Sequence, residues 1–347
     1  MRAATGDFGT YANPSDRRVS RAPDGRTFAA VLATAQTFTL EGIEARPVRV
    51  EVDVHRGLPA FSVVGLPDAA VREARERVRA AMTNCGFEFP LRRIVANLAP
   101  ASLRKAGPGM DLAIAAALMS ASGQLEWVGD LGRVALVGEL ALDGTVRPVA
   151  GGLAIAEAAR QLEVDSIVVP AANGREAALA DGVGVVPVES LGELPAIARG
   201  EQAPPRPQPL SLAPEDRAGD PDLADLRGQR HLRHALEVAA AGGHSVLMIG
   251  PPGAGKSLAA SRLPSILPPL GPEEGLEVAR IASARGPLGA RSAIRPFRAP
   301  HHTISPAGLV GGGNPPVPGE VTLAHRAVRQ RHQRFVAPIG TSERPAR

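Results

Sequence analysis

The sequence has few cysteines, aromatic residues and lysines, and each shortage removes a class of function. Cys85 is the only cysteine in 347 residues, which excludes intramolecular disulfides, four-cysteine zinc sites and CxxC redox chemistry. Aromatic residues make up 3% of the chain, so few rings are available to stack on the bases of single-stranded nucleic acid. Of the 39 basic residues, only Lys105 and Lys256 are lysines. A lysine within a functional motif is therefore conspicuous.

Long apolar runs are also missing. The longest, at 112–119, is well short of the ~18 residues that cross a membrane. The first ten residues, MRAATGDFGT, lack the hydrophobic segment of a secretory signal. The scarcity of cysteine fits a reducing compartment. These features predict a cytoplasmic protein without a membrane partner.

Positive charge is concentrated near the end of the sequence. The formal net charge is +4, but residues 326–347 contain six arginines and one glutamate, so the rest of the chain is close to neutral. A basic block without apolar periodicity is typical of a solvated end. We therefore expect 326–347 to be a disordered basic tail.

Apolar periodicity divides the remaining chain into two units. Residues 1–27 are polar and aperiodic and are expected to form a flexible extension. From 28 to 200, strand and helix patterns alternate. Residues 201–222 include the string APPRPQP and predict a proline-rich linker. A second unit occupies 223–325, so the pattern predicts a mixed α/β and α+β chain of two domains.

The second unit contains a phosphate-binding motif. An apolar strand at 246–249 leads into GPPGAGKS, which fits G-x-x-x-x-G-K-[ST] in full. The glycines let backbone amides approach phosphate oxygens, the lysine reaches the β- and γ-phosphates, and the serine hydroxyl binds Mg²⁺. We expect ATP and Mg²⁺ to bind at Gly250, Pro251, Pro252, Gly253, Ala254, Gly255, Lys256 and Ser257, with Ser257 the metal ligand.

Several strings together identify a family resemblance. They are FSVVGLPDAAV at 61–71, NLAP at 97–100, DLRGQ at 225–229, the phosphate loop, and RPFRAPHHT at 295–303. Over residues 28–325 the chain resembles the magnesium-chelatase-like AAA+ ATPases of the YifB/ComM type. The resemblance implies an N-terminal domain similar to the Lon protease catalytic domain, of ribosomal-S5-like fold, followed by a hexamer-forming P-loop AAA+ domain. It also implies a motor or helicase on branched DNA during transformation, because ComM-type members are implicated in that role.

The chain departs from the Lon pattern at both positions that peptide hydrolysis needs. Lon-type peptidases use a serine nucleophile activated by a lysine. When 107–111 is compared with the Lon Gly-Pro-Ser motif, Gly109 stands at the nucleophile position. When 144–153 is compared with the Lon lysine segment, Leu153 or a neighbour stands at the lysine position, and Lys105 is the only lysine of the domain. We therefore predict a Lon-like domain that is not a peptidase.

The chain also departs from the AAA+ pattern for hydrolysis. An AAA+ ATPase needs an apolar strand ending in Asp-Glu, and the resemblance implies that this strand follows 323–325. Basic residues follow instead, and Asp225 is the last aspartate of the chain. The acids after the phosphate loop are Glu273, Glu274, Glu277, Glu320 and Glu343, none of which ends an apolar strand. We expect a truncated or frame-shifted AAA+ module that binds ATP and hydrolyses it poorly. The truncation argues against the hexamer that the resemblance implies.

Two other functions remain open at this point. One is a magnesium-chelatase ATPase subunit, although the Lon-like front domain argues against it. The other is a non-enzymatic scaffold or binding protein that uses the Lon-like domain alone. The adjacent pair His301 and His302 lacks a second ligand pair at zinc spacing, so we expect it to have a loop or packing role.

Overall fold

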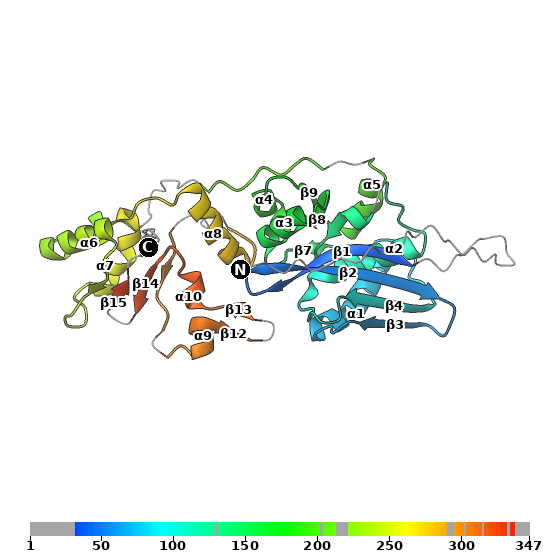
Figure 1. The fold of residues 1–347 in the computed structure, drawn as a ribbon, viewed down its shortest axis with the longest axis horizontal. Helices are drawn as coiled ribbons and strands as arrows, with labels where there is room; N and C mark the ends of the chain where they lie inside the picture. The colour runs from blue at the N-terminus through cyan, green and yellow to red at the C-terminus, as the bar shows by residue number, and fades with distance from the viewer. Residues whose placement is uncertain are drawn as a thin grey trace, which may run out of the picture.

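A computed structural model describes residues 32–128, 131–201, 204–212, 221–289, 295–301, 303–313, 316–331 and 334–336. The predicted extension 1–27 lies outside these residues. The described chain forms a larger N-terminal unit, blue to green in Figure 1, and a smaller C-terminal unit, yellow-green to red. Both combine helices with sheets, so the expected mixed α/β class is confirmed. The likeness of the first unit to the Lon catalytic domain stays a prediction from the sequence.

The N-terminal unit is built on a seven-stranded sheet in the order β3-β4-β2-β1-β5-β8-β9. Its strands are β1 (Ala33–Glu41), β2 (Glu44–His55), β3 (Ala60–Val64), β4 (Arg93–Ala99), β5 (Val134–Leu136), β8 (Ser166–Pro170) and β9 (Gly184–Val188). β2 is antiparallel to β1 and β4, and the other four neighbouring pairs are parallel. β1 and β2 form a long hairpin in which Ala33 lies opposite Val52.

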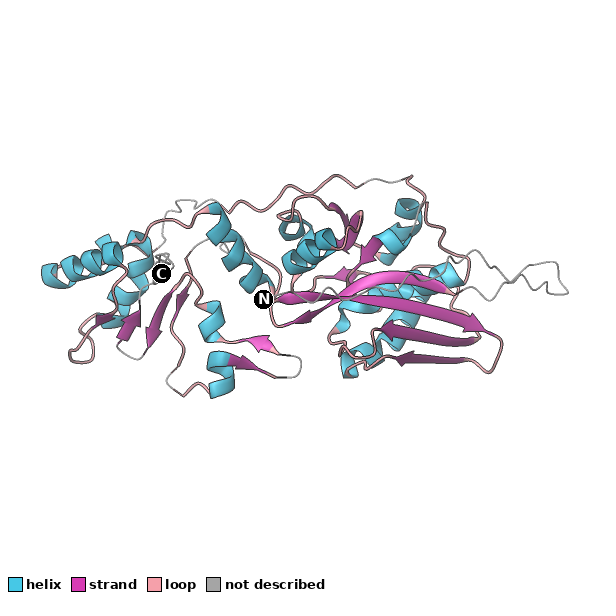
Figure 2. Ribbon diagram, viewed as in Figure 1, coloured by secondary structure: helices cyan, strands magenta, loops and turns pink. Residues whose placement is uncertain are grey.

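Helices cover both faces of this sheet (Figure 2). α1 (Ala69–Asn84) and α2 (Asp111–Ala121) pack on one face, and α3 (Gly152–Gln161) and α4 (Ala171–Ala177) on the other. Alternation along the strands builds the two cores, because Val168 enters the first while its neighbours Ile167 and Val169 enter the second. A fifth helix, α5 (Leu194–Ala198), closes the unit.

Local signals position several of these elements. α1 begins after Asp68, whose carboxylate accepts a 2.8 Å hydrogen bond from the amide of Val71. Asp143 and Gly144, a residue pair typical of two-residue hairpin turns, lie between β6 (Glu139–Leu140) and β7 (Val146–Arg147), which pair antiparallel. Residues 137 and 138 separate β5 from β6.

The C-terminal unit has a four-stranded sheet in the order β10-β15-β14-β11. Its elements are α6 (Arg230–Gly242), β10 (Val246–Leu247), α7 (Lys256–Arg262), α8 (Pro272–Ser283), β11 (Phe297–Arg298), α9 (Pro306–Val310), β12 (Gly311–Gly312), β13 (Val317–Pro318), α10 (Glu320–Leu323), β14 (Val328–Arg331) and β15 (Arg334–Val336). β12 and β13 form a small separate hairpin. None of the helices in the described part of the chain has the length and apolarity to cross a membrane.

The disordered tail expected from residue 326 is corrected for its first part. Val328 is fully buried in the core of the C-terminal unit and pairs with Phe297 of β11. The charge of Arg326 is neutralised by Glu274 at 2.7 Å and Glu277 at 3.0 Å. The many arginines of this segment predicted a solvated tail, whereas burial of the apolar pair 327–328 stabilises its packing on the C-terminal unit. Residues 337–347 lie outside the described chain.

The two units contact each other more closely than a free linker implies. Residues 204–212 have no helix or strand, yet the amide of Leu210 donates a 3.1 Å hydrogen bond to the carbonyl of Arg175. α8 packs on α3, and Ala279 of α8 is fully buried in the second core of the N-terminal unit. The sequence boundary at 201–222 therefore does not separate the two cores in space.

Candidate functional site: the phosphate-binding loop

The predicted phosphate-binding loop joins β10 to α7, as its strand–loop–helix context requires. Met248 anchors the entering strand in the core of the C-terminal unit, and Ala259, Ala260 and Leu263 anchor the departing helix. The regular strand is shorter than predicted, and Ile249, directly before the loop, is 84% exposed. The loop itself is therefore held at both ends and open to solvent between them.

The backbone of the loop has the geometry of an anion cradle. Gly253 and Gly255 have φ values of +80° and +76°, a region that side chains with a Cβ rarely adopt. The amide of Ala254 donates to the carbonyl of Pro251 at 3.3 Å. Across the described residues, no protein acceptor is found for the amides of Gly253 and of 255–257. The loop therefore presents several donors that are available to phosphate oxygens, and it fits a nucleotide.

Lys256 lies across its own loop. Its ammonium donates to the carbonyl oxygens of Gly250 at 2.9 Å and Pro251 at 2.8 Å. These bonds hold the cation beside the free amides, where a phosphate can exchange for the carbonyls. Ser257 is exposed next to it and offers one hydroxyl. No cluster of three metal-binding side chains occurs within the described ranges, so Mg²⁺ would depend on nucleotide phosphates for most of its ligands.

Gln229 is a site residue that motif reasoning missed. Its side-chain amide donates to the carbonyl of Ala254 at 3.2 Å, which ties the start of α6 to the loop. Its backbone has φ +46°, an uncommon conformation for a residue other than glycine. Nearby, Arg262 of α7 contacts Asp225 at 3.4 Å. The only signal for this contact in the sequence is the string DLRGQ at 225–229, which indicates the family resemblance but not a contact with the loop.

The acids that follow the loop in the sequence form no ion pair with it in the described part of the chain. Three form ion pairs: Glu274 with Arg326, Glu277 with Arg326 and His325, and Glu320 with Arg298. Hydrogen bonds from His325 and Arg326 lower the pKa of Glu277, and a hydrogen bond from Arg298 lowers the pKa of Glu320. Glu273 is exposed on α8, and Glu343 lies outside the described residues. Among the acids that can be placed, none contacts the loop.

Apart from the phosphate loop, the structure has a cavity between the N-terminal unit and the β12–β13 hairpin. It is a cavity of about 300 Å³, and its lining includes Gly109 and Pro148, which belong to the two segments compared with the Lon dyad. No serine, cysteine or lysine is among the residues that line it. Leu153 is fully buried in the second core, and Lys105 is buried with its ammonium on the carbonyl of Pro100. The two segments compared with the Lon dyad therefore meet at this cavity, and the absence of peptidase activity stays a prediction from the sequence.

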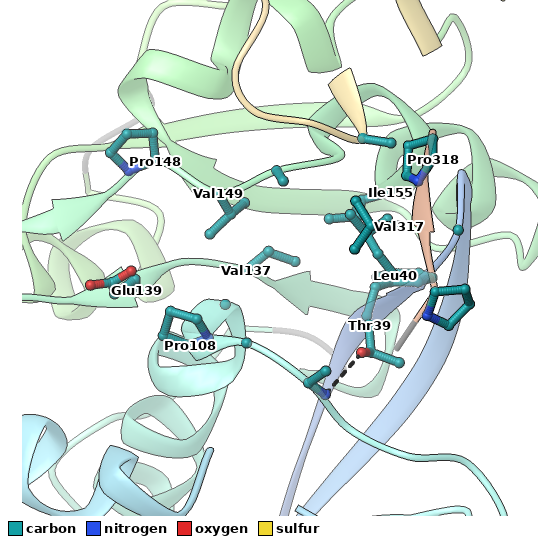
Figure 3. Close-up of a pocket in the computed structure, with 18 residues that line it drawn as sticks. Thr39, Leu40, Pro108, Val137, Glu139, Pro148, Val149, Ile155, Val317 and Pro318 are labelled. Atoms are coloured by element: carbon teal, nitrogen blue, oxygen red, sulfur yellow. Dashed lines mark hydrogen bonds between the residues drawn. The ribbon is translucent and has the colours of Figure 1, made fainter. Parts of the chain in front are cut away.

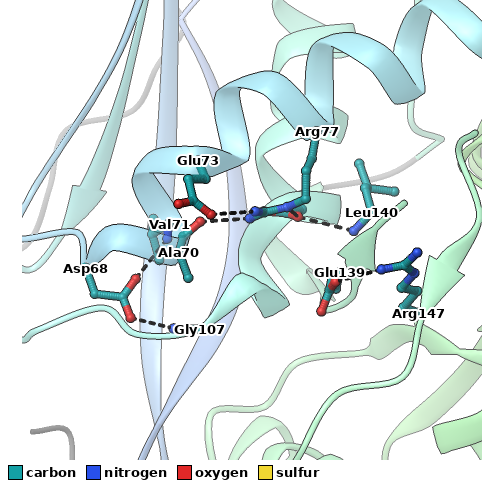
Figure 4. Close-up of polar contacts among 10 residues, drawn as sticks. Asp68, Ala70, Val71, Glu73, Arg77, Gly107, Glu139, Leu140 and Arg147 are labelled. Carbon is teal, nitrogen blue, oxygen red and sulfur yellow. Dashed lines mark hydrogen bonds and ion pairs between the residues drawn. The ribbon is translucent and has the colours of Figure 1, made fainter. Parts of the chain in front are cut away.

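A buried ion pair lies close to this cavity (Figure 4). Arg77 of α1 donates to Asp111 of α2 through two bonds of 2.6 and 3.0 Å, and the amide of Leu140 donates to the same carboxylate at 3.2 Å. Burial is the largest influence on Asp111 and raises the pKa of its carboxyl, although Arg77 acts against it. The pair joins α1, α2 and β6, and we assign it a structural role.

Comparison with known proteins gives two family matches. Residues 222–329 match the family described as magnesium chelatase, subunit ChlI, and residues 50–173 match the family described as subunit ChlI of Mg-chelatase. The phosphate loop lies within the first match, and β2 to β8 lie largely within the second.

Whole-chain relatives cover both units together. The uncharacterized protein Rv2897c of Mycobacterium tuberculosis is 45% identical over 302 residues, which is 86% of this chain and 59% of that protein. YifB of Salmonella typhimurium is 44% identical over 86% of this chain and 58% of its own length. Competence protein ComM of Haemophilus influenzae is 38% identical over 86% of this chain, which spans 59% of ComM. With the two family matches, these relatives show that the chain belongs to the YifB/ComM-type magnesium-chelatase-like proteins.

Proposed function

We propose that the loop at 250–257 binds ATP together with Mg²⁺. The observation that carries the proposal is the row of backbone amides at 253 and 255–257 without a protein acceptor, beside the ammonium of Lys256. The amides and Lys256 would hold the phosphates, and Ser257 would supply one oxygen to the metal. Bound Mg²⁺ supplies charge neutralisation between the phosphates. Gln229 keeps the loop in register through the carbonyl of Ala254.

Titration with a fluorescent ATP analogue tests this proposal. Lys256→Ala is expected to weaken binding by about ten-fold or more, because a hydrogen bond to a charged group typically contributes ~1.5–3 kcal/mol. Arg160→Ala, which removes an exposed cation from α3 in the other unit, is the matched control and is expected to bind as the unchanged chain does. Equal affinities for the unchanged chain and Lys256→Ala would refute the proposal.

We further propose that the 347-residue chain hydrolyses ATP little or not at all. Hydrolysis needs a carboxylate that orients the attacking water, whereas Glu320 contacts Arg298 of β11, and Glu274 and Glu277 both contact Arg326, which precedes β14. Phosphate release from the purified chain is therefore expected to match that of Lys256→Ala. A Mg²⁺-dependent turnover near ~1 s⁻¹ that is lost in the variant would contradict this.

For the longer proteins of this family, we propose that such nucleotide binding drives a hexameric motor on DNA. The support is the likeness to a relative that is named a competence protein. Nucleotide-dependent binding to a four-way DNA junction, in preference to a linear duplex of the same length, tests this role. Equal binding to both, with and without nucleotide, would count against it.

A magnesium-chelatase subunit is the second candidate, because both matched families are described by that activity. Metal insertion into a porphyrin, assayed with the partner subunits of a chelatase, separates the two candidates. Stimulation by this chain would favour the chelatase role over the DNA motor.

A further inference from the structure

The cavity of about 300 Å³ lies beside the junction of β1 and β5 in the large sheet. Within the described chain, β1 pairs with β5 only at Gln36 and Ala135. Residues 38–40 of β1, which follow this pair, line the cavity together with Val137, which follows β5. β1 therefore borders the cavity beyond the single pair that joins it to β5.

The wall of the cavity is apolar. Val137 and Val149 point toward one another across its centre (Figure 3). The hydroxyl of Thr39 is occupied by a 3.3 Å hydrogen bond from the amide of Ala106. The volume is at the lower end of the ~300–1,000 Å³ of ligand pockets. An aliphatic side chain suits this space better than a polar or bulky group.

The two ends of the cavity differ. Glu139 lies at one end, and Leu40, Val317 and Pro318 lie at the other (Figure 3). Glu139 contacts Arg147 at 3.4 Å in a partly exposed ion pair, and such a pair is readily exchanged for another cation.

The chain itself already places an extended segment on the rim. The carbonyl of Pro316 accepts a 3.2 Å hydrogen bond from the amide of Gly42, which lies in the turn between β1 and β2, and β13 follows directly. Main-chain recognition of an extended segment is therefore present at the end opposite Glu139. A second extended segment beside β1 would use the same kind of bond.

We propose that this cavity binds an extended peptide segment of a partner protein, which places an aliphatic side chain between Val137 and Val149 and a lysine or arginine against Glu139. Four features select this occupant: the short pairing of β1 with β5, the apolar wall, the carboxylate at one end and the extended segment on the rim. None of the residues of the phosphate loop lines the cavity, so this binding is expected to be independent of nucleotide.

Fluorescence anisotropy with two synthetic peptides tests the proposal. The probes are fluorescein-labelled Gly-Leu-Val-Lys amide and the matched Gly-Leu-Val-Glu amide. The full chain is expected to bind the lysine peptide at least ten-fold more tightly than the glutamate peptide. Absence of binding, or equal affinity for both peptides, would overturn the proposal.

Substitutions at Gly109 and Glu139 locate the binding. A Cβ at Gly109 meets only Val149 Cγ1 at 3.4 Å and Val137 at 3.9 Å, so Gly109→Ala is expected to bind the lysine peptide normally. Gly109→Leu fills the cavity and is expected to weaken binding at least ten-fold. Glu139→Gln is expected to remove the preference for the lysine peptide and leaves the cavity open. Normal binding by Gly109→Leu, or a preserved preference in Glu139→Gln, would refute the site.

Discussion

At the scale of single residues, the pair Arg77 and Asp111 shows how burial sets the cost of a charge. Asp111 is 1% exposed, and its carboxylate has Arg77 as its cation. Arg77→Ala leaves that carboxylate buried without a partner and is expected to lower the free energy of unfolding by about 3–5 kcal/mol. Arg75→Ala, which removes an exposed pair with Glu76, is expected to cost less than ~1 kcal/mol. Urea unfolding of the unchanged chain, Arg77→Ala and Arg75→Ala measures both differences in the free energy of unfolding.

The buried carboxyl of Asp111 also predicts how the loss of stability in Arg77→Ala depends on pH. Burial raises the pKa of the Asp111 carboxyl above its ordinary value of 3.8, and loss of Arg77 raises it further. A carboxyl with a raised folded-state pKa contributes stability that is present at low pH and is lost as pH rises through that pKa. The deficit of Arg77→Ala is therefore expected to be smaller at pH 5 than at pH 7. A deficit that is constant between these pH values would contradict the assignment.

At the scale of elements, the turn after β3 depends on one glycine. Gly65 has φ +100°, and a Cβ there would lie 2.1 Å from the carbonyl oxygen of Leu98 in β4. Gly65→Ala is expected to lower the free energy of unfolding by at least ~2 kcal/mol, because it adds a backbone clash to the strain of a left-handed residue. Gly86→Ala, at φ +82° but with no atom within 4 Å, is the matched control and carries the strain alone. Equal losses in the two variants would show that the close approach to β4 is unimportant.

Elements whose signals are local were predicted well from the sequence, and elements that depend on distant packing were not. The phosphate loop lies between a strand and a helix, as its motif requires. α8 was not predicted, because its buried face is completed by α3, more than a hundred residues earlier in the chain. The contact of Gln229 with the loop was missed for the same reason. Spacing within a motif is visible in a sequence, whereas a partner brought close by the fold is not.

At the scale of the whole molecule, α8 belongs to the C-terminal unit by sequence and to the N-terminal unit by packing. Arg280 forms two bonds of 2.6 and 2.7 Å with Glu157 of α3. The carbonyl of Ser283 accepts a 2.7 Å bond from the amide of Gly151, and its hydroxyl accepts a 3.3 Å bond from the amide of Leu153. These bonds fix one arrangement of the two units, because the buried polar groups of Ser283 need their partners.

The last prediction tests whether this contact holds the two units together. Ser283 is fully buried, so Ser283→Leu adds volume where none is available and removes the hydrogen bond to Leu153. Amides over 272–283 are expected to exchange hydrogen at least ~10-fold faster in this variant, because α8 separates from α3 more often. Amides of 256–262 in α7 are expected to be unchanged, since α7 is anchored in the separate core that contains Leu263 and Met248. Glu273→Ala, on the exposed side of α8, controls for effects on the helix itself. Unchanged protection of α8 in Ser283→Leu would mean that α8 does not depend on its contact with α3.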